Sequence, residues 1–179
     1  MKRVLIAAAL LGSVSSAAAD RVGLSGSGNA SVYQSGGQSV TAAPSFGVGA
    51  HYLLDLDRAA TLRIEAELLP NLYGLGRLGF GGEVAYLQTV LSDPLSQTYV
   101  GGGMGSTLVF SGTNVVRTLE PTLLVGLRVT TTPAFTGFAE LAGGVSFLKI
   151  KADSGAQYTE RDAAGLFLKP RVGVLFTLR

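Results

Sequence analysis

The amino-acid sequence predicts an all-β chain, an eight-stranded antiparallel up-and-down transmembrane β-barrel that follows a cleaved signal peptide. Three observations lead to this fold class. The chain begins like an export signal, segments of alternating apolar and polar residues recur along it, and charged residues make up only 15% of it. Ordinary soluble domains contain about 25% charged residues. An exported chain that alternates along its length and carries little charge is typical of a membrane barrel.

The export signal is expected to occupy residues 1–19. In "MKRVLIAAALLGSVSSAAAD" two cations precede an apolar stretch, and three alanines precede Asp20. This is the order of a secretory signal, and its apolar stretch is too short to span a membrane as a helix. We therefore expect residues 20–179 to form the barrel as one domain.

Composition excludes several other classes of protein. The chain has no cysteine, which rules out a disulfide framework and a zinc-thiolate site. Removing the two cations of the signal lowers the formal net charge from +2 to about zero, so a nucleic-acid partner is not expected. No apolar run after the signal reaches the roughly 18 residues of a membrane helix. A membrane-spanning chain must then pair its backbone groups between the strands of a closed barrel.

Eight segments alternate between apolar and polar residues and are predicted to be strands. They lie near residues 22–34, 43–55, 59–69, 73–90, 97–110, 117–131, 134–150 and 164–179. In the third segment, "ATLRIEAELL", the apolar residues alternate with Arg63, Glu65 and Glu67. The sixth and eighth segments alternate in the same way. Because successive side chains of a strand point to opposite faces, each strand has one apolar face and one mixed face.

The connections between these segments alternate in length. "DLDR", "SDPLSQ" and "TTPA" follow even segments and are compact turns with Asp or Pro, whereas "SGGQS", "PNLYG", "SGTNVVR" and "KADSGAQYTERDA" follow odd segments and are longer loops. Short periplasmic turns, longer external loops and an even strand count are typical of outer-membrane barrels. Since proline removes a ladder hydrogen bond, we expect Pro121 and Pro170 near the loop-side ends of their strands.

Alternation alone does not say which face points outward. A soluble periplasmic lipocalin-like ligand-binding barrel with an apolar interior would alternate too, and it stays open as an alternative. The mixed face is rich in Gly, Ser and Thr, however, whereas a solvated exterior would be crowded with charges. We therefore expect the apolar face to contact lipid and the mixed face to line the lumen.

The mixed face also carries balanced charges, which predict a lumen charge network. Its expected members are Arg63, Glu65, Glu67, Arg77, Glu83, Glu120, Arg128, Glu140, Lys169 and Arg171. Buried charges are tolerated when they are paired, and eight strands leave an interior that side chains just fill. We therefore expect a lumen filled by paired charges; the alternative is a narrow channel for small solutes.

The sequence offers two weak candidates for a catalytic or nucleotide-binding motif. His51 is the only histidine, and neither a nucleophile elbow nor metal-ligand spacing surrounds it. "GLGRLG" at residues 74–79 has the glycine spacing of a dinucleotide loop, but an alternating segment follows it rather than a helix. We expect no enzyme activity, cofactor or metal; a lipid-modifying enzyme that uses His51 is the alternative.

The export signal, the eight segments, the short turns and the final strand "VGVLFTLR" together resemble the small OmpA/OmpX-type outer-membrane barrel families. The resemblance is one of pattern and covers the whole mature chain. It implies a location in the bacterial outer membrane, contact with outer-membrane lipids, and recognition of the last strand by the barrel-insertion machinery. It also implies a structural or surface-interaction role.

Overall fold

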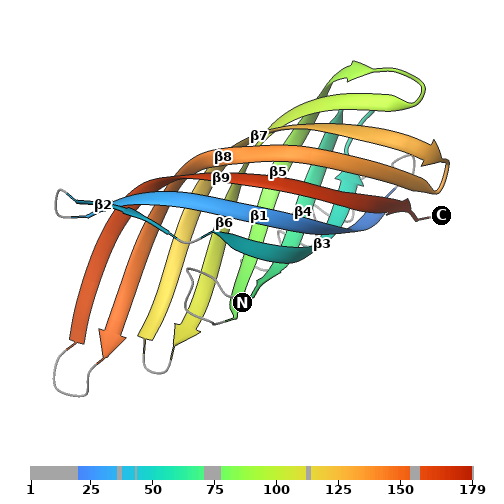
Figure 1. The fold of residues 1–179 in the computed structure, drawn as a ribbon. Coiled ribbons are helices and arrows are strands. Elements are labelled where there is room, and N and C mark those ends of the chain that lie inside the picture. The colour runs from blue at the N-terminus through green and yellow to red at the C-terminus, as the bar shows by residue number, and fades with distance from the viewer. Residues whose placement is uncertain are drawn as a thin grey trace, which may run out of the picture.

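The computed structural model describes residues 20–35, 38–42, 44–70, 78–111, 114–153 and 158–178. Within these ranges the chain forms one antiparallel sheet of nine strands (Figure 1). The strands are β1 (Arg21–Ser35), β2 (Gln38–Thr41), β3 (Ser45–Asp55), β4 (Ala60–Leu69), β5 (Gly79–Ser92), β6 (Ser96–Ser111), β7 (Asn114–Thr132), β8 (Phe135–Asp153) and β9 (Tyr158–Thr177). No helix long and apolar enough to cross a membrane occurs in the described part of the chain.

Eight of these strands close into a ring, which confirms the predicted barrel. From β3 onward each strand pairs with the next, β3 pairs with β1, and β9 pairs back with β1 from Arg21↔Thr177 to Gln34↔Ala164. The short strand β2 pairs only with the far end of β1 and was not predicted. It forms a small hairpin beside the ring (Figure 1).

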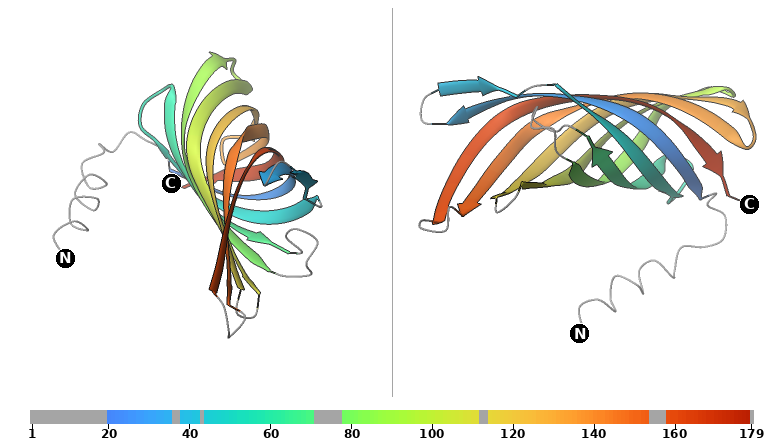
Figure 2. Two further views of the ribbon diagram at one scale, coloured as in Figure 1. Left: turned by 90° about the vertical axis from the view of Figure 1, so that its left-hand side faces the viewer. Right: turned by 60° about the horizontal axis from the view of Figure 1, so that its bottom comes forward.

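The two ends of the barrel differ. The connections after β3, β5 and β7 lie at one end, together with the start of β1 and the end of β9 (Figure 2). In the first of these turns, Asp57 accepts hydrogen bonds from the backbone N–H groups of Ala59 and Ala60, both at 2.7 Å. These two bonds hold the pKa of the Asp57 carboxyl below its usual value. We call this end the short-turn end and the opposite one the loop end.

The strands at the loop end are longer than predicted. Residues 114–117, expected in a loop, belong to β7, and β8 and β9 extend to Asp153 and Tyr158. The extension keeps one register, with Val115 opposite Lys151 and Lys149 opposite Asp162. Ladder pairing with β8 continues along both β7 and β9, so the hairpins extend beyond the ring. Residues 73–77 of the fourth predicted segment lie outside the described residues.

The expectation for the two prolines was wrong. Pro121 and Pro170 lie inside β7 and β9 rather than near their ends, and each stays paired on one side, opposite Met104 and Leu141. On its other side, each proline lies in a two-residue gap of the ladder. The gap at Pro121 is between β7 and β8, and the gap at Pro170 is between β1 and β9. Each proline therefore interrupts the ladder toward a single neighbour, and the strand continues because the other neighbour still holds it.

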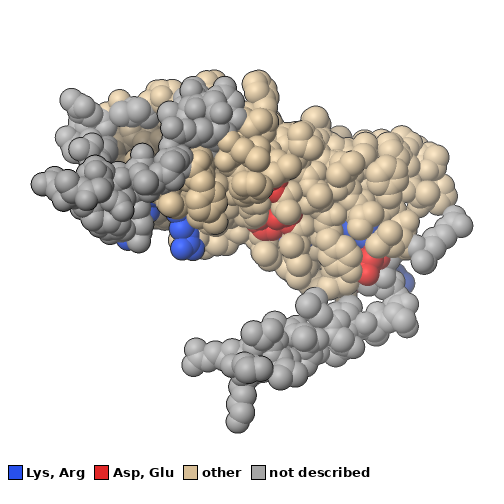
Figure 3. Space-filling model, turned by 90° about the horizontal axis from the view of Figure 1, so that it is seen from below, with Lys and Arg blue, Asp and Glu red and all other residues tan. Residues whose placement is uncertain are grey.

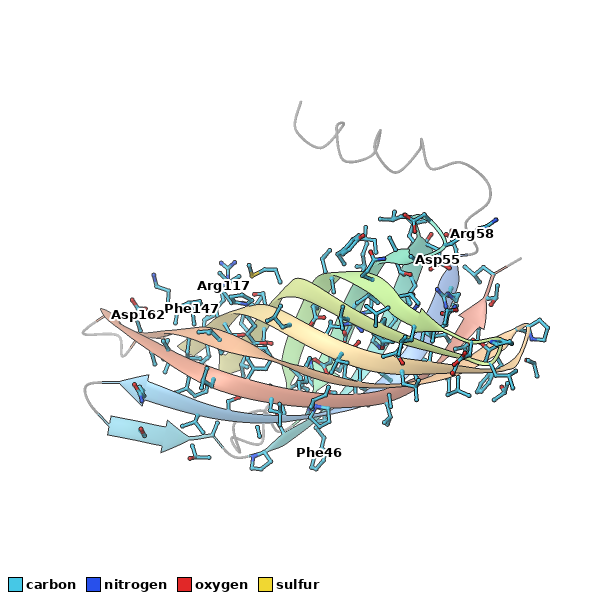
Figure 4. All side chains as sticks on the ribbon, turned by 90° about the horizontal axis from the view of Figure 1, so that it is seen from above. Phe46, Asp55, Arg58, Arg117, Phe147 and Asp162 are labelled. Carbon is cyan, nitrogen blue, oxygen red and sulfur yellow. The ribbon has the colours of Figure 1, made fainter. Side chains whose placement is uncertain are left out.

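The outside of the barrel is apolar and the inside is polar. Side chains alternate between buried and exposed along β3, and its outward residues include Phe46, which is 72% exposed. Leu123 on β7 is 76% exposed, and Figure 4 shows Phe46 outside the strands. The face seen in Figure 3 carries charges only in a few small patches. Because water does not favour so large an apolar surface, this exterior is suited to lipid.

A charge placed on this exterior should distinguish lipid from water. Val125 points outward near the middle of β7 and is about half exposed. We predict that Val125→Arg lowers the free energy of unfolding in lipid vesicles by about 2–4 kcal/mol, the cost of an arginine near the bilayer midplane. Val125→Leu is the matched control. Urea unfolding measures both, and a change within about 0.5 kcal/mol for arginine would place this face in water.

Candidate functional site

The candidate site is the charged interior of the barrel. Nine of the ten residues of the expected network lie in the described part of the chain, and Arg77 lies outside it. All nine are buried: Arg63, Glu65, Glu67, Glu83, Glu120, Arg128, Glu140, Lys169 and Arg171. They come from β4, β5, β7, β8 and β9. The strand period places them inside, because each lies on the mixed face of its strand.

Four of these residues form a closed set of ion pairs, which we call the charge ring. Arg63 donates to Glu83 and Glu140, both at 2.6 Å. Arg171 donates to the same two carboxylates, at 2.6 Å to Glu83 and 2.5 Å to Glu140. Each guanidinium uses both terminal nitrogens and each carboxylate uses both oxygens. Each group thus bridges two partners of opposite charge, and hydrogen bonds between ionised groups are roughly twice as strong as those between neutral groups.

The charge ring spans the lumen. Arg63 and Glu83 come from the adjacent strands β4 and β5, whereas Glu140 and Arg171 are opposite each other in the register of β8 and β9. In the strand order of the barrel these two pairs of strands lie on opposite walls. The four side chains therefore tie one wall of the barrel to the other through its centre.

Glu65 is a third carboxylate beside the ring. One of its oxygens lies 3.4 Å from an Arg171 nitrogen and 4.0 Å from an Arg63 nitrogen. Neither oxygen has a hydrogen-bond partner among the described residues. The same oxygen lies 3.8 Å from Nδ1 of His51, so Glu65 connects the charge ring to the only histidine.

Three other members of the network have partners outside the charge ring. Lys169 donates to Glu67, whose second oxygen accepts a hydrogen bond from Ser27. Glu120 accepts a hydrogen bond of 3.2 Å from Ser146, and no cation lies within ion-pair distance of it in the described ranges. The interior thus contains several polar groups stacked along the barrel rather than one continuous network.

Arg128 does not join a carboxylate within the part of the chain that is described. Its guanidinium lies over the ring of Tyr99, 4.5 Å from the ring centroid, as a cation–π pair. Tyr99 in turn donates to Glu140 at 3.1 Å. Gly126 is opposite Tyr99 in the register of β6 and β7, and a β-carbon on Gly126 would overlap the tyrosine ring. A glycine is therefore needed at this position for the tyrosine to lie across the lumen.

His51 has a partner that the sequence analysis missed. Its Nε2 lies 2.6 Å from the hydroxyl oxygen of Ser25, while Nδ1 faces Glu65 without a hydrogen bond. All three side chains are buried, and the cavity beside His51 measures about 10 Å³. That volume holds about one water molecule, so no substrate fits there. The alternation of "RVGLSGSGNASVY" could have placed Ser25 inside, but only the pairing of β1 with β3 brings it to His51.

The described residues do not form a metal centre. No group of three or more His, Asp or Glu side chains in the described ranges could hold a metal ion. The carboxylates of the charge ring already accept hydrogen bonds on every oxygen. The interior is thus arranged to neutralise charge rather than to bind a cation.

Removing one cation from the charge ring should show how much the ring contributes to the free energy of unfolding. We predict that Arg171→Met lowers the free energy of unfolding by about 3–5 kcal/mol, because the substitution leaves buried carboxylates underpaired. Arg117→Met is the matched control, since Arg117 is exposed on β7 and should change stability by less than about 1 kcal/mol.

A second variant separates lost pairing from lost packing. Arg171→Met combined with Glu83→Gln removes one charge of each sign and should recover part of the loss, as coupled neighbours do. Urea unfolding in detergent micelles measures all three variants. Equal effects of Arg171→Met and Arg117→Met would contradict a stabilising charge ring.

No protein-family model matches this chain, and no curated protein matches it in sequence. Solved structures do resemble it. The outer membrane protein OprG from Pseudomonas aeruginosa superposes with a TM-score of 0.62 at 10% identity, over 90% of this chain and 97% of OprG. The outer membrane protein AlkL gives a TM-score of 0.62 at 12% identity, over 90% of each chain.

Neisserial surface protein A gives a TM-score of 0.57 at 11% identity, over 88% of this chain and 97% of that protein. At such low identity the likeness establishes the fold alone. The chain has the fold of a small outer-membrane β-barrel.

Proposed function

We propose that the protein is an integral outer-membrane β-barrel of the small OmpA/OmpX type, with a structural or surface-interaction role. Its lumen is closed by paired charges. The charge ring carries this proposal, because two arginines and two glutamates cross the lumen and use all of their terminal nitrogens and oxygens on one another. Residues 1–19 serve as the signal peptide, and residues 20–179 form the membrane domain.

The apolar exterior supports the membrane location. Outward side chains such as Phe46, Leu123 and Leu166 are each more than half exposed. Outer-membrane lipids cover these side chains in the bilayer, and the barrel-insertion machinery receives the last strand, β9. Because charged side chains line the lumen, the interior does not suit the apolar ligand of a lipocalin-like barrel.

The long strands at the loop end support a role at the cell surface. β8 and β9 have 19 and 20 residues, whereas β4 has 10. A barrel strand needs about 9–11 residues to cross a bilayer, so β8 and β9 project by roughly eight residues or more. At this length Asp153 and Tyr158, the described ends of the two strands, lie beyond the lipid head groups, where a partner outside the cell could reach them.

The buried group around His51 supports a non-enzymatic role. Ser25, His51 and Glu65 occur in an order that resembles a hydrolase triad, but Nδ1 of His51 makes no hydrogen bond to Glu65. The adjacent cavity of about 10 Å³ admits no lipid or peptide. A hydrolase needs a reacting group within reach of the nucleophile, and this interior leaves no room for one.

Recording from planar bilayers tests the closed lumen. We predict no stepwise current above background for the wild-type protein, because the charge ring fills the centre of the barrel. The matched variant replaces Arg63, Glu83, Glu140 and Arg171 by alanine, which leaves the net charge unchanged and should produce currents. Stepwise currents from the wild type would favour the alternative function, a narrow channel for small solutes.

Fractionation of cells tests the location in the same preparation. The protein should be recovered with the outer membrane and should run faster on a gel when it is not boiled, as closed barrels do. Recovery in the soluble periplasmic fraction would contradict the proposed function whatever the bilayer recordings give.

A further inference from the structure

The short-turn end contains a cavity that is lined mainly by polar side chains. Its volume is about 740 Å³. Five threonines and Gln97 contribute hydroxyl and amide groups to its wall; Arg21, Arg58 and Arg128 contribute positive charge, and Asp55 and Asp57 contribute negative charge. Figure 4 places Asp55 and Arg58 at this end of the barrel, away from Arg117 and Asp162 at the loop end. The cavity is large enough for a small ligand and its wall is suited to a polar one.

Arg128 is the unusual member of this wall. It is only 3% exposed, yet no carboxylate of the described residues lies within ion-pair distance of it, and its Nη2 has no hydrogen-bond partner there. Arg63 and Arg171, the other deeply buried arginines, each bind two carboxylates. Stacking on Tyr99 uses the flat face of the guanidinium. The N–H donors lie in the plane of the group, so stacking leaves them free for a ligand.

Arg21 supplies a second donor at the same cavity. Its Nη2 donates to Asp55 at 2.5 Å, and Thr61 donates to the same Asp55 oxygen at 2.8 Å. This pairing neutralises and orients the Arg21 side chain, while its Nε remains without an acceptor among the described residues. Asp55 thus pairs with Arg21, whereas no carboxylate of the described residues lies within ion-pair distance of Arg128. A buried charge without a partner is strongly unfavourable unless a counter-charge reaches it.

We propose that the cavity at the short-turn end binds a phosphate group, with Arg128 as its main ligand and Arg21 as a second donor. The planar fork of a guanidinium matches two oxygens of a phosphate, and threonine hydroxyls on the wall can donate to the others. The phosphate can belong to a free ion or to a lipid head group at the membrane face of this end. Tyr99 lies between Arg128 and Glu140 of the charge ring, and the site does not require the lumen to conduct.

Calorimetric titration of the folded, full-length protein with inorganic phosphate tests the site. The protein is held in dodecyl maltoside, which carries no phosphate. We expect saturable binding tighter than about 1 mM. Arg128→Gln should weaken the binding at least about tenfold, as the loss of a charge-assisted hydrogen bond does.

The control carries the same change of charge. Arg117→Gln alters an exposed arginine on β7 at the loop end, which does not line the cavity. It should keep the affinity within about threefold, because an exposed charge outside the site contributes little. Faster migration of the unboiled protein on a gel verifies that each variant is folded. If Arg128→Gln does not fold, Arg128→Lys keeps the charge, loses the planar fork and should still weaken binding.

The outcomes are distinct. Absence of saturable binding to the wild type, or equal affinity of the wild type and the Arg128 variant, would overturn the proposal. Equal weakening by Arg128→Gln and Arg117→Gln would also overturn it, because this would indicate a general charge effect. Adding phosphatidylglycerol to the micelles then separates the two sources of phosphate. Loss of phosphate binding assigns the site to a lipid head group, and unchanged binding assigns it to a free ion.

Discussion

The ion pairs between Arg63, Arg171, Glu83 and Glu140 are the interaction on which the rest of this structure depends. Each of these charges would be strongly unfavourable in a lumen without water, and each is neutralised by two partners on the ring. Because the partners come from opposite walls, the ion pairs also connect those walls across the lumen. Gly126 leaves room for the ring of Tyr99, which donates to Glu140 of the charge ring.

The same requirement makes the strand register specific. Glu140 and Arg171 are direct partners of β8 and β9, and a slip of one residue would move both charges to the lipid side. The slip would also bring outward residues such as Leu141 and Val172 into the lumen. Both errors are unfavourable at once, so the charge ring and the apolar exterior select the same register. This agreement between pairing and burial favours a single structure in a chain that has no cysteine for a disulfide.

Alternation in the sequence predicts the eight strands of the ring, their antiparallel order and the difference between the two faces. It predicts the inner face for residues such as Arg63, but it does not predict that Arg128 would stack on Tyr99 or that Ser25 would reach His51. Those contacts join neighbouring strands, β6 with β7 and β1 with β3, and they depend on the exact register of each pair and on the side-chain rotamers. The strand extensions at the loop end were missed because turn-like residues there still alternate well enough to continue a ladder.

Spin labelling tests the central claim most directly, that an apolar exterior in lipid surrounds an ion-paired interior. The chain has no cysteine, so single cysteines at Leu123, Val125 and Leu127 can be labelled without a background, with Arg58 in a turn as the control. In lipid vesicles we predict that collisions with oxygen are frequent at the three β7 positions and collisions with a water-soluble nickel complex are rare. The turn position should give the reverse. Frequent collisions with nickel along β7 would contradict the account, because the apolar face would then lie in water.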